Sequence, residues 1–231
     1  MVSALILPSP LLGQAPYEPL VSVLAATAGW HVAVADLPLD PSDPHEVLTA
    51  FGNAVCDSTD LLVAHSNAGY YLPALAQVRD IAAVAMDAAL PTGDGTDTLL
   101  APVKLRDFLA GLPKDDAGRL PPWPEWWARE DVEPLYPDVA SFERSLAAAP
   151  RLSMSYFTSR LPVPVGWATG RRAYLAFGQT YAVERAWASD SGWRVREVPG
   201  AHLEFLTDPG LVASELVALG AELGLPEPPR S

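Results

Sequence analysis

The chain has 231 residues and a mass of 24.6 kDa, which is enough for one hydrophobic core and predicts a single domain over 1–231. Acidic residues outnumber basic residues by 28 to 15, and the formal net charge is -13. We therefore expect neither nucleic acid nor an anionic membrane as a partner, because both need a basic patch.

Cysteine content and apolar runs bear on the location of the protein. Cys56 is the single cysteine, so no intramolecular disulfide can form, and it lies in a stretch that we interpret as a helix face. The first residues lack the cationic segment of a signal peptide. No apolar run approaches the roughly 18 residues that a membrane span needs. These features predict a cytoplasmic protein.

Short apolar runs alternate with amphipathic stretches in the first part of the chain, which is typical of strand-helix units that build a parallel sheet. Strands are predicted at 4–7, 31–35, 60–64 and 81–86, and helices at 17–30 and 67–78. Another helix is predicted to begin at Asp43, because Asp43, Pro44 and Glu46 have the spacing of an N-cap with a capping box.

The regular alternation weakens at Gly93, where proline and tryptophan become frequent. We interpret about 92–162 as a helical cap inserted over the sheet. Strands return at 173–177 and 193–198, with a helix around 183–189 between them and a last helix that begins at Asp208-Pro209. The predicted fold class is α/β, a three-layer sandwich with a mostly parallel sheet.

The segment Ala64-His65-Ser66-Asn67-Ala68-Gly69 joins a predicted strand directly to a predicted helix. A nucleophilic serine at such a turn needs small residues two positions before and after it, because larger side chains would collide where the chain reverses. Gly-x-Ser-x-Gly is the usual form, and here Ala64 and Ala68 take the glycine positions. The helix start would also direct backbone N–H groups at a developing oxyanion. The alternative is that Ser66 is only a helix N-cap.

His202 follows the last predicted strand and precedes the last predicted helix. Sites in parallel sheets open at the carboxyl ends of the strands, so this loop is a suitable place for a catalytic base. A neutral imidazole there could take the proton of the Ser66 hydroxyl and later give it to a leaving group. The alternative is a solvated loop side chain.

Through these two segments and the strand-helix alternation between them, the chain resembles the α/β-hydrolase fold family. The resemblance covers nearly the whole chain except about 92–162, which corresponds to the variable lid of that family. It implies that Ser66 is the nucleophile and His202 the general base of a catalytic triad. It also implies a compact member, since the chain begins at what corresponds to the family's third strand.

The acid of the triad departs from the family's common pattern. In most members it follows the strand that corresponds to 173–177, where this chain has no carboxylate in 178–181. A minority carries the acid one strand earlier, at the position of Asp87, and the order Ser66, Asp87, His202 is then kept. Asp36 and Glu184 are weaker alternatives, and a site without an acid is left open.

The resemblance further implies two donors in an oxyanion hole. One is the N–H of Asn67, which follows the nucleophile. The other should come from the loop after the first strand, but this loop reads Pro8-Ser9-Pro10-Leu11, and proline has no N–H. Either the Leu11 N–H or the Ser9 hydroxyl would have to supply the second hydrogen bond.

Aromatic residues near these segments indicate what the site accepts. Trp123, Trp126 and Trp127 in the insertion, together with Tyr70 beside Ser66, suggest an apolar or aromatic substrate pocket beneath the cap, to which Ser9 would also contribute. The alternative is that these rings only anchor the cap.

The sequence predicts a serine hydrolase, like an esterase or thioesterase, that acts on an acyl bond of a small, mostly apolar molecule. We expect no cofactor, because nucleotide-binding glycine motifs are missing, and no metal, because no histidine pair has ligand spacing and one cysteine cannot build a zinc site. Lyase, isomerase or cyclase chemistry on the same fold and non-catalytic ligand binding are the alternatives. The substrate's identity and the oligomeric state are left open.

Overall fold

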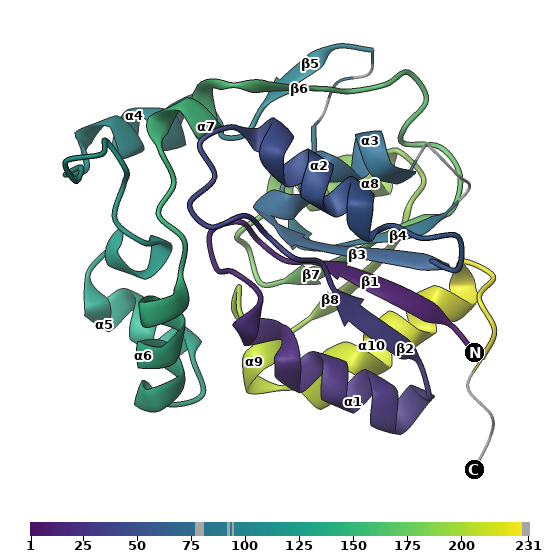
Figure 1. Ribbon diagram of the computed structural model, residues 1–231. Coiled ribbons are helices and arrows are strands. Elements are labelled where there is room, and N and C mark those ends of the chain that lie inside the picture. Colours follow the sequence, from purple (N-terminus) through teal and green to yellow (C-terminus); the bar gives the residue numbers. More distant parts are fainter. Residues whose placement is uncertain (77–80, 92, 94, 228–231) are drawn as a thin grey trace.

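A six-stranded sheet in the order β2-β1-β3-β4-β7-β8 forms the centre of the computed structural model, which describes residues 1–76, 81–91, 93 and 95–227 (Figure 1). All neighbouring strands of this sheet are parallel. β3, β4 and β7 are buried at every residue, so most of each strand reads as an apolar run in the sequence, and the polar residues of these strands lie at or next to their ends. The strands are β1 (Ser3–Leu7), β2 (His31–Val34), β3 (Leu61–Ser66), β4 (Ala82–Ala88), β7 (Arg172–Phe177) and β8 (Arg194–Val198).

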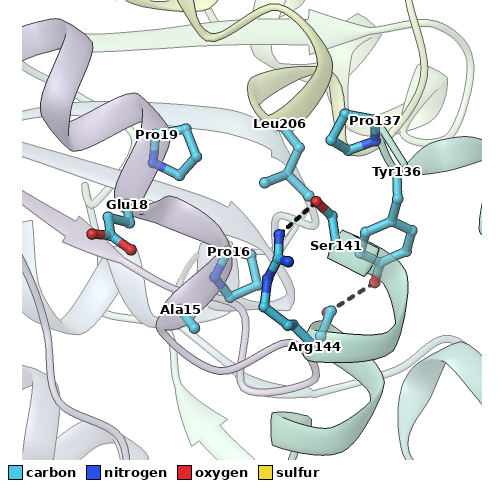
Figure 2. Close-up of a pocket in the computed structure, with 10 residues that line it drawn as sticks. Ala15, Pro16, Glu18, Pro19, Tyr136, Pro137, Ser141, Arg144 and Leu206 are labelled. Atoms are coloured by element: carbon cyan, nitrogen blue, oxygen red, sulfur yellow. Dashed lines mark hydrogen bonds between the residues drawn. The ribbon is translucent and has the colours of Figure 1, made fainter. Parts of the chain in front are cut away.

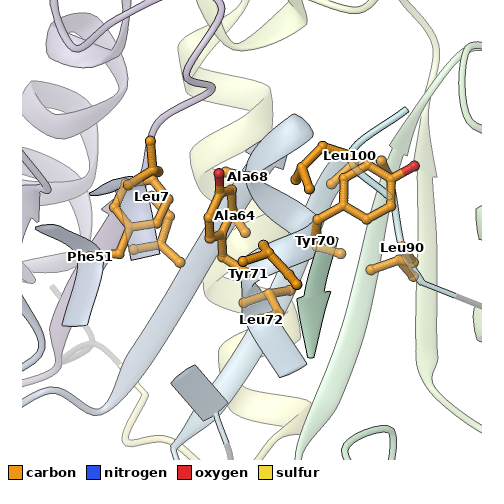
Figure 3. Packing of buried hydrophobic residues seen from close by; sticks show 14 of the residues in the cluster. Leu7, Phe51, Ala64, Ala68, Tyr70, Tyr71, Leu72, Leu90 and Leu100 are labelled. Carbon is orange, nitrogen blue, oxygen red and sulfur yellow. The ribbon is translucent and has the colours of Figure 1, made fainter. Parts of the chain in front are cut away.

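Helices cover both faces of the sheet, which confirms the predicted three-layer sandwich (Figure 1). One face carries α1 (Glu18–Ala28), α9 (Glu204–Thr207) and α10 (Pro209–Glu222), preceded by the turn η1 (Ala15–Tyr17), and the other carries α2 (Pro44–Ala54), α3 (Leu72–Ala76) and α8 (Ala182–Asp190). Each face has its own hydrophobic cluster. Figure 3 shows the cluster beneath α2 and α3, where Phe51 and Tyr71 pack edge to face.

Two helix starts follow from their local sequences, as predicted. The Asp43 carboxylate accepts a hydrogen bond from the His45 N–H at 2.9 Å, and Glu46 accepts one from the Asp43 N–H at 3.2 Å, which completes the capping box. Asp208 accepts from the Leu211 N–H at 2.9 Å and begins α10. Each bond satisfies a donor that the first helical turn leaves without a partner.

Local structure differs from the prediction at two places. The helix predicted at 67–78 begins with a 3-10 turn, η2 (Asn67–Tyr71), before α3, and its positions 77 and 78 lie outside the described residues. The expected place of Cys56 on a helix face is wrong, because α2 ends at Ala54 and Cys56 is exposed. Cys56 instead begins a turn in which the Thr59 N–H donates to its carbonyl at 3.0 Å.

The insertion between β4 and β7 contains a short β-pair as well as helices, so it is not wholly helical. Thr98 pairs with Leu161 in an antiparallel ladder, which ties the two ends of the insertion together. We refer to the described residues between β4 and β7 as the cap. Its elements are β5 (Asp97–Leu99), α4 (Val103–Gly111), η3 (Trp123–Glu125), α5 (Arg129–Val132), η4 (Glu133–Leu135), α6 (Val139–Ala148), α7 (Met154–Thr158) and β6 (Arg160–Pro162).

None of the helices in the described ranges combines the length and the apolar character that crossing a bilayer requires.

Gly69 lies where η2 passes closely over the end of β4. A Cβ atom at this position would overlap the carbonyl oxygen of Ala89 and lie 2.9 Å from the Cβ of Ala88. We expect Gly69→Ala to lower the free energy of unfolding by about 2 kcal/mol or more, as overpacking against backbone does. Urea denaturation measures the change. Gly52→Ala in α2 is the matched control, since nothing lies within 4 Å of that position, and an equal effect of the two substitutions would contradict the prediction.

Candidate active site

Ser66 sits at the sharp junction between β3 and η2. Its backbone has φ 57° and ψ -128°, a region that costs a residue with a side chain about 1–3 kcal/mol and that is concentrated at functional sites. Ala64 and Ala68 are fully buried, which agrees with the need for small residues beside the turn. The Ser66 carbonyl accepts a hydrogen bond from the Ala89 N–H at 3.0 Å, so the end of β4 holds the junction in place.

Asp87 reaches the site through a bulge in β4. His65 pairs with Met86 and Ser66 pairs with Ala88, so Asp87 is the extra residue, and its φ is 40°. Tyr174 on β7 fixes the next residue, because its hydroxyl donates to the Ala88 carbonyl at 2.7 Å and accepts the Ala88 N–H at 3.0 Å. The bulge turns the Asp87 carboxylate out of the ladder and towards the carboxyl edge of the sheet.

The structure brings Ser66, Asp87 and His202 together. His202 Nε2 lies 3.1 Å from Ser66 Oγ, and His202 Nδ1 lies 2.6 Å from Asp87 Oδ2. Asp87 Oδ1 accepts the Phe177 N–H at 3.0 Å. With the Nδ1 proton donated to Asp87, Nε2 can accept the hydroxyl proton of Ser66. Relative exposures of 4%, 1% and 9% for Ser66, Asp87 and His202 show that the three groups are shielded from water.

The other two candidate acids do not contact His202. Asp36 accepts a hydrogen bond from the Gln14 side chain at 3.0 Å. Glu184 lies half-buried on α8, and burial raises the pKa of its carboxyl. Among the described residues, the carboxylate on the His202 ring is that of Asp87.

The loop after β1 uses its polar groups internally. Ser9 is fully buried, and its N–H donates to the Tyr17 hydroxyl at 2.8 Å. The Leu11 N–H, a predicted oxyanion donor, points back into the loop and donates to Ser9 Oγ at 3.4 Å. Ser9 Oγ therefore accepts this hydrogen bond, and the Ser9 hydroxyl proton remains available for donation to another group. The Asn67 N–H, at the first position of η2, has no partner within that turn.

The side chain of Asn67 connects the nucleophile turn to the cap. Its Nδ2 donates to the Leu100 carbonyl, and its Oδ1 accepts from the Tyr156 hydroxyl, each at 2.7 Å. The Tyr71 hydroxyl completes the chain, 2.7 Å from that of Tyr156. Asn67 therefore offers its backbone to the site while its side chain holds two cap segments.

His65 precedes Ser66, and the sequence assigns it no role. In the structure its ring is fully buried and contacts both His202 and Tyr17. Burial, followed by the charge of His202, holds the pKa of His65 well below its usual value, so the ring is neutral. The Tyr17 hydroxyl accepts from Ser9, so its own proton is donated to His65 Nδ1 at 2.7 Å. His65 Nε2–H then donates to the His202 carbonyl at 3.2 Å, and the two imidazoles stack 4.7 Å apart.

The neutral state of His65 makes folding stability depend on pH. The unfolded chain protonates this histidine below its ordinary pKa near 6.5, whereas the folded protein does not, so the stabilising contribution is complete above that pH and is lost as the pH falls. We expect a contribution to the slope of up to about 1.4 kcal/mol per pH unit below pH 6.5. Urea denaturation at pH 7 and pH 5 tests this, with His65→Gln as the non-titrating control. Equal losses in the two proteins would contradict it.

The predicted aromatic pocket residues have different surroundings in the structure. The Trp123 ring centroid lies 6.2 Å from that of His202, and Tyr70, whose pKa burial raises to about 12, is 8% exposed. Trp126 instead belongs to the interior of the cap, since its Nε1–H donates to the Pro121 carbonyl at 2.8 Å. Trp127 is 43% exposed and stacks on Phe108. Trp123 is thus the predicted ring that the structure places against the triad.

A separate cleft of about 220 Å³ lies between the cap and the first helix (Figure 2). Figure 2 shows Pro16 and Leu206 on one side and Tyr136 on the other, with Arg144 hydrogen-bonded to Ser141. Its lining includes neither Ser66, Asp87 nor His202, so this cleft is not the space in front of the triad.

Tyr181 is a site residue that the sequence did not reveal. It follows β7, and its hydroxyl lies 3.3 Å from Ser66 Oγ. The ring centroids of Tyr181 and His202 are 5.5 Å apart. Burial raises the pKa of the phenol, so it remains a hydrogen-bond donor over the whole physiological range. No local motif marks such a residue, because only the packing of β7 and α8 brings it to the serine.

Comparisons with known proteins identify the fold. No family model matches the chain, and no curated protein matches its sequence. Solved structures do match. An extracellular α/β-hydrolase from a Paenibacillus species, described as sharing structural and functional homology with tobacco salicylic acid binding protein 2, has a TM-score of 0.73 at 15% identity, over 95% of this chain and 99% of that chain. A pyrethroid hydrolase has a TM-score of 0.70 at 18% identity, over 96% and 98%.

A bromoperoxidase from Bacillus anthracis also matches, with a TM-score of 0.61 at 12% identity over 95% of this chain and 92% of that chain. The protein therefore has the α/β-hydrolase fold, as the resemblance of its sequence implied.

Proposed function

We propose that this protein is a serine hydrolase of the esterase or thioesterase type, with Ser66, His202 and Asp87 as its catalytic triad. The observation that carries the proposal is the contact of 3.1 Å between His202 Nε2 and Ser66 Oγ, with Asp87 2.6 Å behind the imidazole. Three residues that lie far apart in the chain have the order and the geometry of a nucleophile, a base and an orienting acid.

The proposed reaction proceeds in two stages. His202 Nε2 takes the hydroxyl proton as Ser66 Oγ attacks the carbonyl carbon, and the imidazolium then gives this proton to the leaving group as the bond to it breaks. In the second stage a water molecule replaces the leaving group and releases the acid. Asp87 holds the imidazole in one tautomer throughout. The Asn67 N–H is one donor to the oxyanion, and the second is either the Ser9 hydroxyl or the Leu11 N–H once it is released from Ser9 Oγ.

The substrate we propose is small and mostly apolar, with no cofactor, metal, nucleic acid or membrane involved. The Trp123 ring beside His202 and the low exposure of Ser66 support an apolar substrate. A pyrethroid hydrolase and an esterase domain from Rhodothermus marinus share the fold at 18% and 14% identity, which supports hydrolysis. We also propose that the protein acts in the cytoplasm, on the evidence of its single free cysteine.

Covalent labelling tests the proposal. A fluorophosphonate should add its phosphonyl mass to one peptide, the one that contains Ser66, and Ser66→Ala should prevent this. Ser3→Ala is the matched control. Ser3 is the first residue of β1 and lies at the opposite end of the parallel strands from Ser66, so its replacement should not affect labelling. Labelling that persists in Ser66→Ala would refute the assignment of the nucleophile.

The loop after β1 favours one second candidate, proton-transfer chemistry of the lyase, isomerase or cyclase kind. Pro8 and Pro10 have no N–H. The N–H of Ser9 donates to the Tyr17 hydroxyl, and the N–H of Leu11 donates to Ser9 Oγ. A weak oxyanion hole slows acyl transfer but leaves His202 able to move a proton. Turnover of a non-acyl substrate that depends on His202 and yields no covalent Ser66 adduct would support this candidate.

A further inference from the structure

The Tyr181 hydroxyl donates its hydrogen bond to the nucleophile in the resting site. Ser66 Oγ gives its own proton towards His202 Nε2, 3.1 Å away, so it can only accept from the phenol at 3.3 Å. The backbone of Tyr181 is fixed at the head of α8, where the Arg185 N–H donates to its carbonyl at 2.9 Å, and its ring lies against that of His202 with centroids 5.5 Å apart. The donor is therefore positioned before any substrate arrives.

The strand order places this donor on one side of the serine. β1, whose loop carries Ser9 and Leu11, is next to β3 on one side, while β4, β7 and β8 follow on the other. Tyr181 follows β7 and His202 follows β8, so both approach Ser66 from the side opposite to the oxyanion loop. The leaving group must also lie on that side, since it receives its proton from His202.

We propose that Tyr181 is a catalytic residue that donates a hydrogen bond to the leaving-group oxygen of an ester. This inference rests on the proposed function. Once Ser66 Oγ has become bonded to the acyl carbon, it is a poorer acceptor, and the phenol is free to turn to the departing oxygen. As the carbon–oxygen bond breaks, its electron pair stays on that oxygen, the Tyr181 O–H stabilises the developing charge, and the His202 imidazolium supplies the proton. Tyr181 keeps its own proton.

A series of butyrate esters with one acyl group and different leaving groups tests this role. An ethyl ester has a poorly stabilised leaving oxygen, whereas a 4-nitrophenyl ester disperses the charge itself. Tyr181→Phe should lower kcat/KM by about 100-fold for the ethyl ester, the effect of losing one such donor, and by only a few-fold for the 4-nitrophenyl ester. The logarithm of the rate should then depend more steeply on the leaving group's acidity than in the unaltered protein.

The matched control is Tyr136→Phe in the cap, whose hydroxyl contacts Ser145 and which should leave both rates unchanged. An equal loss for both esters in Tyr181→Phe, or no loss, would overturn the inference. If this variant does not fold, 3-fluorotyrosine at position 181 keeps the shape and strengthens the donor. It should raise the ethyl ester rate relative to the 4-nitrophenyl rate, and an unchanged ratio would overturn the inference.

Failure of this inference is distinguishable from failure of the proposed function. Ser66→Ala should abolish turnover of every ester in the series, whatever Tyr181 does. If Ser66→Ala is inactive and the loss in Tyr181→Phe is the same for all esters, only the role of Tyr181 is refuted. If Ser66→Ala keeps its activity, or if the unaltered protein hydrolyses no ester, the proposed function falls and the role of Tyr181 falls with it.

Discussion

Ser66→Ala is expected to lower kcat for ester hydrolysis by about 10⁶-fold, the size of effect seen when the serine of a triad is removed. The hydroxyl that lies 3.1 Å from His202 Nε2 is the only group that the proposed mechanism joins to the substrate. Steady-state kinetics with a 4-nitrophenyl ester measure the loss. A residual rate within tenfold of the unaltered protein would show that another group attacks.

The same position offers a test of backbone strain. At φ 57° and ψ -128°, alanine is strained like serine, while glycine is not. Ser66→Gly should therefore be as inactive as Ser66→Ala but more stable than it by about 1 kcal/mol, after the entropy cost of glycine is subtracted. Equal free energies of unfolding for the two variants would show that the turn stores no strain.

Asp87→Asn is expected to lower kcat by about 10⁴-fold with little change in the fold. Asparagine can still accept the Phe177 N–H, which donates to Asp87 at 3.0 Å. Its amide group can donate to His202 Nδ1, which moves the imidazole proton to Nε2 and removes the acceptor for the Ser66 proton. Measured kcat values, together with an unchanged urea midpoint, check this prediction.

Glu184→Gln is the matched control for Asp87→Asn. Glu184, an alternative acid from the sequence, lies on α8 after β7 and does not contact the His202 ring, so we expect a change of only a few-fold. A larger loss in Glu184→Gln than in Asp87→Asn would assign the orienting role to Glu184.

The parts of the fold that local sequence determines were predictable. Buried strands such as β3 show as short apolar runs, here Leu61 to Ala64, and the capping box at Asp43 fixes a helix start within a few residues. The pairing of Ser66 with His202 was also predictable, because the ends of parallel strands share one edge of the sheet, and Ser66 ends β3 while His202 lies in the loop after β8. The position of Asp87 follows from the same rule.

Other features depend on contacts between distant segments and leave no local pattern. β5 and β6 have three residues each, too few to show a periodicity, and they become strands only by pairing with each other. Tyr181 and Tyr17 become parts of the site only through the packing that brings them to Ser66 and His65. A polar His65 inside a fully buried strand is the one signal that could have indicated a hydrogen-bond network.

The oxyanion loop shows a third kind of difficulty. The sequence establishes that Pro8 and Pro10 lack an N–H, but it does not show where the remaining donors point. The structure shows that the Ser9 N–H is bonded to Tyr17 and that the Leu11 N–H is bonded to Ser9 Oγ. Such orientations depend on the backbone path of a short loop, which residue type alone does not determine.

The formation of an acyl-enzyme on Ser66 is the most direct test of the account. The protein should be mixed with a 4-nitrophenyl ester, quenched with acid within the first turnovers, and analysed by mass spectrometry of the intact chain and of its peptides. The account predicts the mass of one acyl group on the peptide that contains Ser66, and no added mass in Ser66→Ala. Ester turnover with no acyl group on that peptide at any quench time, or with the group on another residue, would contradict it.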